Sequence, residues 1–141
     1  MKSLRSIIGC TAAGLVLLTA CRNDAPKTGS PGKAAQTYMT YAYERDFEQF
    51  ANAFIFASDT VEPDRHDANV RAVKEILDEK GDEFYLPTDS VAQIRILTED
   101  IDETGQRAKV TLETVCHGGR RDTTVHDLVK TGAEWKFIEI K

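Results

Sequence analysis

Residues 106–140 read QRAKVTLETVCHGGRRDTTVHDLVKTGAEWKFIEI, and this stretch decides the fold class. Apolar and polar side chains alternate along it with a period of two, which is typical of strands that bury one face. Glycines interrupt the alternation at two points, where we expect turns. We therefore predict a meander of four antiparallel strands at residues 91–99, 106–117, 120–130 and 134–140.

The turn at Gly118-Gly119 sets the expected register of the central hairpin, because glycine accepts the positive φ that a two-residue type I′ turn needs at both positions. The expected pairs are Val110 with Asp127, Thr111 with His126, Leu112 with Val125 and Glu113 with Thr124. Asp127 would then have apolar neighbours, which raise the pKa of a carboxyl and suit it to general acid or base catalysis. The alternative places Asp127 at the solvent or beside Lys136.

The register of the last hairpin stays open. A loop of two or of three residues fits Thr131-Gly132-Ala133, and a shift of one residue exchanges the two faces of a strand. Either Trp135 and Phe137 or Ile138 and Ile140 therefore face the interior.

The segment before the strands has helical spacing. Ser30 and Pro31 predict the first helix, as its N-cap and first residue. Asp46 with Gln49 resembles a capping box for a second helix. Its apolar stripe is Phe47, Phe50, Ala51 and Phe54. A third helix is expected at residues 64–80, ended by Gly81, with Val70, Val73 and Leu77 buried and His66 one turn upstream. The fold class is α+β, with helices packed on a curved four-stranded antiparallel sheet in one domain at residues 31–141.

The amino terminus has the pattern of a bacterial lipoprotein signal. Two basic residues precede an uncharged apolar run that ends in Leu18-Thr19-Ala20-Cys21, a lipobox. We predict a signal peptide at residues 1–20, cleavage between Ala20 and Cys21, lipidation of Cys21 and a flexible tether at residues 21–30. The protein is therefore expected in the bacterial cell envelope, with the membrane as partner through its lipid anchor. Arg22 stands where lipoproteins kept at the inner membrane tend to have aspartate, which favours the outer membrane.

Charge and cysteine content exclude several functions. Loss of Lys2 and Arg5 with the signal leaves 16 basic and 23 acidic side chains, a net charge of −7. Such a surface repels phosphates, so we predict no nucleic-acid partner. Cys116 remains the single unmodified cysteine, so the domain forms no internal disulfide and Cys116 is expected to be buried.

Two motifs resemble a known family. Tyr43-Glu-Arg-Asp-Phe-Glu-Gln-Phe50 and the terminal hairpin at residues 127–137 resemble nuclear-transport-factor-2-like (NTF2-like) proteins, which have a cystatin-like cone. More narrowly, the chain is similar to small lumazine-binding-like bacterial lipoproteins classed as a domain of unknown function. The resemblance implies a cone with one open end. Relatives use that cone as an enzyme pocket, a ligand pocket or a dimerisation surface.

The candidate site residues follow from these expectations. Tyr38, Tyr41, His66, His126 and Trp135 would line a ligand pocket, unless the aromatic side chains simply fill the cone. The three histidines lack the spacing of metal ligands, and we predict neither a metal nor a cofactor.

We expect a lipid-anchored envelope protein that binds a partner protein or a small apolar ligand without catalysis. One alternative is a small isomerase-like or hydratase-like enzyme with Asp127 as its catalytic residue. The other is a structural module that forms a homodimer.

Overall fold

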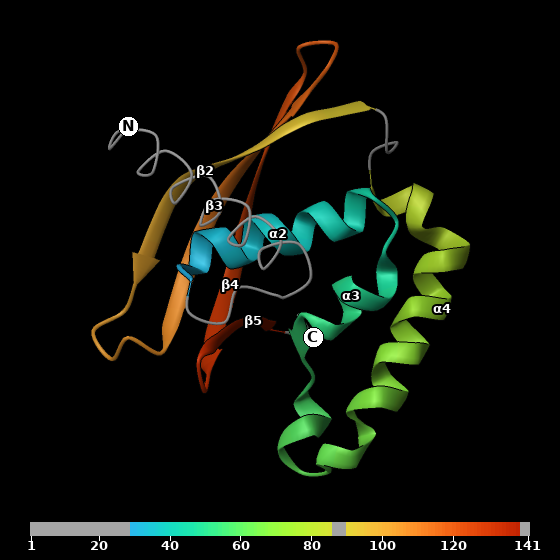
Figure 1. The fold of residues 1–141 in the computed structure, drawn as a ribbon, viewed down its shortest axis with the longest axis vertical. Helices are drawn as coiled ribbons and strands as arrows, with labels where there is room; N and C mark the ends of the chain where they lie inside the picture. Colours follow the sequence, from blue (N-terminus) through green and yellow to red (C-terminus); the bar gives the residue numbers. More distant parts are fainter. Residues whose placement is uncertain (1–28, 86–89, 139–141) are drawn as a thin grey trace, which may run out of the picture.

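The computed structural model describes residues 29–85 and 90–138 (Figure 1). The predicted signal peptide, the cleavage site at Ala20 and Cys21, and most of the tether lie outside the described residues. The described elements are α2 (Pro31–Tyr43), α3 (Phe47–Asn52), β1 (Phe54–Ile55), η1 (Ala57–Thr60), η2 (Pro63–Arg65), α4 (His66–Phe84), β2 (Val91–Ile101), β3 (Arg107–Cys116), β4 (Arg121–Thr131) and β5 (Glu134–Ile138). None of the helices in these two ranges is both long and apolar enough to cross a membrane.

The first two helices begin where the sequence predicts. The hydroxyl of Ser30 accepts a hydrogen bond from the Lys33 N–H, and the Asp46 carboxylate accepts one from the Gln49 N–H at 3.3 Å. At the start of α2, Glu99 of β2 also accepts a hydrogen bond from the Gly32 N–H at 2.6 Å. This second acceptor ties the helix to the sheet and satisfies another of the free donors at a helix N-terminus.

The predicted end of the third helix at Gly81 is wrong. Helix α4 runs on to Phe84, and Gly81 is buried in it against α3. A Cβ at Gly81 would lie 2.5 Å from Cζ of Phe47, so glycine is present here because α3 packs too closely for a side chain. The predicted stripe is confirmed, since Val70 and Leu77 are buried and Val73 packs against the core.

The sheet has five strands rather than four, in the order β1-β5-β4-β3-β2. The four strands from β2 to β5 form the predicted antiparallel meander, while β1 pairs in parallel with β5 through Phe54 and Phe137. Helix α3 ends at Asn52 with Ala53 as its C-cap, so Phe54 belongs to β1 and not to the helix as predicted. A two-residue strand has no periodicity of its own, and only a partner distant in sequence creates it.

The register of the central hairpin differs from the predicted one by one residue. Cys116 N–H donates to the Arg120 carbonyl, and Gly119 has φ +90°, so the loop has three residues with glycine in the left-handed region. Val110 therefore pairs with His126, and Lys109 pairs with Asp127. The shift exchanges the faces of β4, so that His126 lies on the inner face and Asp127 on the outer face.

The last hairpin takes the shorter of its two possible loops. Thr131 pairs with Glu134 across Gly132-Ala133, and this register turns Trp135 and Phe137 into the core. Residue Ile140 lies outside the described residues.

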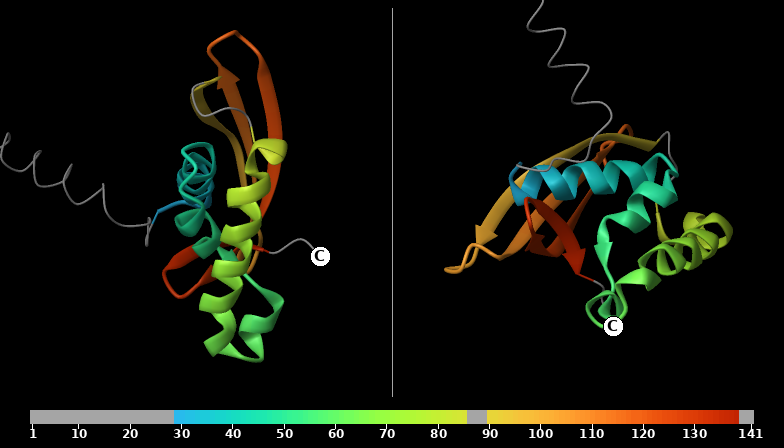
Figure 2. Two further views of the ribbon diagram at one scale, coloured as in Figure 1. Left: turned by 90° about the vertical axis from the view of Figure 1, so that its right-hand side faces the viewer. Right: turned by 60° about the horizontal axis from the view of Figure 1, so that its bottom comes forward.

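The core lies between α2 and the sheet. Figures 1 and 2 show α2 crossing the inner face of the sheet, with α3 and α4 beyond its end and the β3–β4 hairpin projecting past the helices. Buried residues of α2 pack on the inner positions of β2, β3 and β5. The main members are Ala34, Ala35, Tyr38, Ala42, Val110, Leu112, Leu128, Trp135 and Phe137.

Candidate functional site

Tyr38 and Trp135, two of the predicted pocket residues, lie in the filled core. Tyr38 is 1% exposed, and its hydroxyl donates to the Trp135 carbonyl at 2.6 Å. Burial, helped by the charge of Glu134, raises the pKa of Tyr38 to about 12. This hydrogen bond holds α2 against β5, so the Tyr38 hydroxyl does not donate to a ligand.

A cleft opens where β5 separates from β4. The last paired residues of these two strands are Leu128 and Phe137, and the next residues, Asp127 and Ile138, are not paired with each other. The cleft has a volume of about 450 Å³. Its lining residues are Phe54, Arg107, Ala108, Val125, His126, Asp127, Leu128, Phe137 and Ile138. Apolar side chains thus meet a few polar ones, as in small-molecule sites.

His126 is the polar group on the inner side of this cleft. Its ring stacks on Phe137, with centroids 5.1 Å apart and 28° between the planes, and Nε2 lies 2.9 Å from the Thr124 hydroxyl. Burial lowers the pKa of His126 below its usual range, against the opposing effect of the Asp127 charge. The imidazole is therefore neutral at pH 7.

Asp127 lies at the solvent, the alternative that the sequence left open, and not in the apolar surroundings that follow from the predicted register. Its side chain is 65% exposed on the outer face, where its carboxylate lies 3.9 Å from the Lys109 ammonium. An exposed carboxylate beside a lysine is the ordinary setting of a surface ion pair. The structural basis for using Asp127 as a general acid or base is therefore absent.

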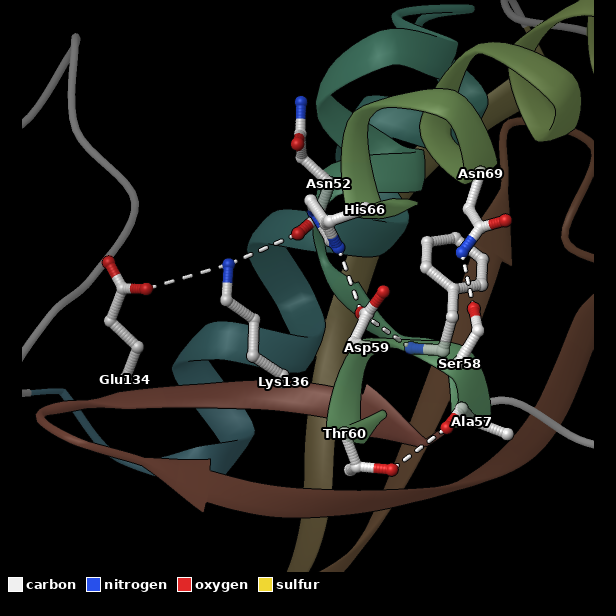
Figure 3. Close-up of polar contacts among 10 residues, drawn as sticks. Asn52, Ala57, Ser58, Asp59, Thr60, His66, Asn69, Glu134 and Lys136 are labelled. Atoms are coloured by element: carbon white, nitrogen blue, oxygen red, sulfur yellow. Dashed lines mark hydrogen bonds and ion pairs between the residues drawn. The ribbon is translucent and has the colours of Figure 1, made fainter. Parts of the chain in front are cut away.

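A second polar cluster surrounds His66 (Figure 3). His66 Nδ1 lies 2.9 Å from Asp59 Oδ2, and the same oxygen accepts a hydrogen bond from the Phe56 N–H. Because the carboxylate only accepts, Nδ1 of His66 carries the proton. Asp59 Oδ1 is buried and has no hydrogen-bond partner among the described residues.

The pKa of Asp59 reflects this environment. Burial raises it, while the Phe56 N–H, the contact with His66 and the neighbouring Asn69 lower it, and the net shift is downward. Figure 3 also shows the Asn69 amide donating to the Ser58 hydroxyl at 2.7 Å. The cluster holds η1 against the start of α4 and thereby stabilises the loop between β1 and α4.

Sequence reasoning missed Asp59, although a signal was available. Asp59 follows Phe56 by three residues, the spacing of a capping box, and its carboxylate does accept from the Phe56 N–H. The sequence analysis predicts a contact of Lys136 only with Asp127. In the structure it donates to the Asn52 carbonyl at 3.1 Å and lies 3.5 Å from Glu134 (Figure 3).

The five predicted pocket residues do not converge on one cavity. His126 lines the cleft, Tyr38 and Trp135 are core residues, His66 contacts Asp59, and Tyr41 packs at the edge of the core on α2. Burial, with smaller effects of Asp46 and Glu44, raises the pKa of Tyr41. Cys116 is buried with a free thiol. Among the residues at 29–85 and 90–138 no cluster of three potential metal ligands occurs.

Comparison with known proteins identifies the fold. No protein-family model matches the chain, and no curated protein matches it. A crystal structure from Campylobacter jejuni, named an "NTF2-like transpeptidase", is similar with a TM-score of 0.53 and 16% identity, covering 79% of this chain and 100% of that one. The chain has an NTF2-like fold.

A second similar structure is the solution structure of a SEC-C motif-containing protein from Rhodopseudomonas palustris. It has a TM-score of 0.48 and 17% identity, and the match covers 85% of this chain and 82% of that one. At these identities the similarity concerns the fold alone. Proteins with one fold can have unrelated activities, so the NTF2-like fold alone does not assign a function to this chain.

Proposed function

We propose that this protein is a lipid-anchored protein of the bacterial cell envelope whose domain binds a small apolar ligand without catalysis. The cleft at His126 carries the proposal, because it combines a volume of about 450 Å³ with aromatic and aliphatic walls. A cavity of this size suits a small molecule. If the ligand is instead a partner protein, we propose that the partner binds at the same cleft.

The lining specifies the chemistry of the ligand. Phe54, Leu128 and Phe137 offer apolar surface, and His126 is neutral at pH 7 because burial opposes its charged form. A neutral imidazole attracts neither an anion nor a cation strongly, so the proposed ligand is uncharged where it meets this wall. Arg107 and Asp127 give the cleft polar residues of both signs.

The absence of catalysis is proposed because neither Asp127 nor the His66–Asp59 pair has a catalytic setting. Asp127 is exposed beside Lys109, and the His66–Asp59 pair clasps a loop, with neither residue among those that line the cleft. The resemblance to lumazine-binding-like lipoproteins also supports the binding of a ligand.

Binding is tested with a neutral apolar fluorescent probe, N-phenyl-1-naphthylamine, titrated into the full chain. Ile138→Arg places a charge in the cleft wall, while Ile76→Arg makes the same change at an exposed position of α4. We expect saturable binding that Ile138→Arg weakens at least tenfold, about 1.4 kcal/mol, and that Ile76→Arg leaves unchanged. Equal binding by both variants would show that the probe binds elsewhere.

The lipid anchor is tested separately by fractionation. The predicted anchor is Cys21, so Cys21→Ser is expected to move the protein from the membrane fraction to the soluble fraction. Cys10→Ser, which changes the other cysteine of the amino-terminal segment, serves as the matched control. Membrane association that persists in Cys21→Ser would contradict the anchor.

A further inference from the structure

Two arginines on the outer face of the sheet share one carboxylate. Nη1 of Arg95, on β2, lies 3.4 Å from Oε1 of Glu113, on β3, and Nη1 of Arg121, on β4, lies 3.5 Å from the same oxygen. These side chains lie on the side of the sheet opposite the helices (Figure 2), because the neighbours Leu112 and Thr114 are buried on the inner face. One carboxylate cannot neutralise two guanidinium groups, so one positive charge is in excess.

Most of the hydrogen-bonding capacity of the two arginines is unused. A guanidinium group has five N–H donors. Among the contacts of the described residues, Arg95 donates one long hydrogen bond to Glu113 at 3.4 Å, and the Arg121 guanidinium makes only the ion pair. The side chains of Arg95 and Arg121 are 48% and 59% exposed, whereas that of Glu113 is 15% exposed. The remaining donors are therefore accessible from the solvent.

The two guanidinium groups are close enough to bind one carboxylate together. Because each Nη1 lies within 3.5 Å of the same oxygen, the two nitrogens are no more than about 7 Å apart, a gap that the two oxygens of a carboxylate can bridge. Arginine also matches the planar geometry of a carboxylate better than lysine does. Thr123, which pairs with Glu113 from β4, is exposed and adds a hydroxyl to this face.

The charge of the chain is distributed unevenly between the two layers of the fold. Residues 31–84, which include the three helices, carry 6 basic and 12 acidic side chains, a net charge of −6. Residues 90–138, which form the meander, carry 7 basic and 8 acidic side chains, a net charge of −1. Packed layers lie about 10 Å apart, and charges more than about 8 Å apart are largely screened at physiological ionic strength. The acidic helices therefore have little effect on an anion at the outer face.

The next charged row of the outer face lies further along the strands. Lys109, four residues from Glu113 on β3, forms an ion pair with Asp127 and is opposite Asp100 of β2. At about 3.3 Å per residue this row is about 13 Å from Glu113, beyond the screening length. Its acids therefore do not cancel the positive charge in excess at Glu113.

We propose that Arg95 and Arg121 form a docking surface for an acidic segment of a partner protein. A carboxylate of the partner replaces Glu113 as the acceptor of their hydrogen bonds. A protein segment fits this surface better than a polyanion such as a nucleic acid, because only one positive charge is in excess and the whole chain has a net charge of −5. Both cations are arginines, which are enriched at protein–protein interfaces, whereas lysines are depleted there.

This docking surface is separate from the cleft at His126. Neither arginine, nor Glu113 between them, is among the residues that line the cleft. Exposed ion pairs contribute little to stability, so the exchange of Glu113 for a carboxylate of the partner costs little. The proposal stands whether or not the cleft binds a ligand.

Binding is measured by NMR with the ¹⁵N-labelled full chain and two synthetic peptides with blocked ends. The peptide SGEEGS carries two neighbouring carboxylates, and SGQQGS has the same length without charge. We expect SGEEGS to shift the amide signals of Arg95, Glu113 and Arg121 saturably, and to bind at least tenfold more tightly than SGQQGS. Raising sodium chloride from 0.05 M to 0.5 M should weaken its binding at least threefold, because salt screens the attraction.

Single substitutions separate the roles of the three side chains. Arg95→Gln and Arg121→Gln should each weaken the binding of SGEEGS at least threefold, while Arg71→Gln, exposed on α4, should leave it unchanged. Glu113→Gln removes the carboxylate that competes with the partner, so it should tighten binding at least threefold. Glu79→Gln, also exposed on α4, is the matched control and should not change binding. A gain in affinity cannot result from damage to the fold.

Three results would overturn the proposal. Equal binding of SGEEGS and SGQQGS by the unmodified chain would exclude recognition of a carboxylate, without the need for any variant. Saturable shifts confined to the helices or to the cleft would place the acidic peptide elsewhere. Weaker binding by Glu113→Gln would reject the replacement of Glu113 by a carboxylate of the partner.

Discussion

The imidazole of His126 stacks on the ring of Phe137, with 5.1 Å between the ring centroids. Phe137 also contacts Phe54 at 5.2 Å, and Phe54 is followed by Phe56, whose ring lies 5.7 Å from His66. A row of three phenylalanines therefore connects the two histidines. They sit at opposite ends of this row, the one beside the cleft and the other beside Asp59.

Phe137 joins the core to the cleft, and its removal is expected to be costly. It is 3% exposed and its ring also meets Tyr38, so Phe137→Ala should lower the free energy of unfolding by about 3–5 kcal/mol. Urea unfolding followed by circular dichroism measures the change. Val61→Ala, at a well-exposed position, should change stability by less than about 0.5 kcal/mol. Similar losses for the two variants would contradict the central position of Phe137.

Gly81 is expected to tolerate no side chain. Gly81→Ala puts a methyl group 2.5 Å from the Phe47 ring and should cost about 1–3 kcal/mol through overpacking, although alanine favours a helix. The matched control is Gly118→Ala, since nothing lies within 4 Å of a Cβ at that position. The melting temperatures of the two variants measure the difference, and that of Gly81→Ala should be the lower. A Gly81→Ala variant more stable than the natural chain would mean that α3 and α4 adjust freely.

Stability should fall as the pH drops below about 6.5 because of His126. Burial lowers its pKa in the folded chain, so the unfolded chain takes up the proton first and acid favours unfolding. At pH 7.5 both states are neutral at this residue and the effect disappears. We expect the difference in urea midpoint between pH 7.5 and pH 5.5 to shrink in His126→Gln. An unchanged difference would assign the pH dependence to other groups.

Asp59 is expected to stabilise the η1 loop at neutral pH. Its pKa is lowered in the folded chain, so this stability is present above the ordinary carboxyl pKa, about 3.9, and is lost as the pH falls through the lower folded value. Asp59→Asn removes the charged acceptor of the Phe56 N–H and should cost about 1–3 kcal/mol at pH 7. Asp64→Asn, exposed in η2, is the control. Equal stability of the two variants at pH 7 would show that the Asp59 contacts do not stabilise the folded chain.

Asp127→Asn should be nearly silent in stability. The exposed carboxylate lies 3.9 Å from Lys109, and a surface pair of this kind contributes about 0–1 kcal/mol. Chemical denaturation in low and in high salt measures the contribution, which salt should reduce further. A large loss of stability in Asp127→Asn would instead indicate that Asp127 is buried, as the predicted register implies.

The local sequence was sufficient for the elements whose causes are local. The cap of α2 at Ser30, the cap of α3 at Asp46 and the alternation of the four meander strands all depend on neighbours a few residues away. The same alternation gave the α+β class. Hydrogen bonding at a helix end and burial of one face of a strand are short-range effects, so a reader of the sequence can find them.

The sequence failed where two distant segments, or one extra residue, decided the outcome. Strand β1 exists because Phe54 meets Phe137, and α4 passes Gly81 because Phe47 packs on it. The candidate site failed for the same reason. A turn of three residues in place of two moved His126 inward and Asp127 outward, and no local signal distinguishes these turns at Gly118-Gly119.

The sequence by itself therefore determined the three helices, the four strands of the meander and their order, and it predicts the lipid attachment at Cys21. The tertiary structure alone decided which face each residue of β4 takes and where the cleft opens beside Phe137. The physical reason is that side chains alternate between the two faces of a strand with a period of two. A register shift of one residue exchanges the faces but leaves the alternating pattern itself the same. Only the packing of α2 against the sheet, with Tyr38 bonded to Trp135, selects one of the two faces.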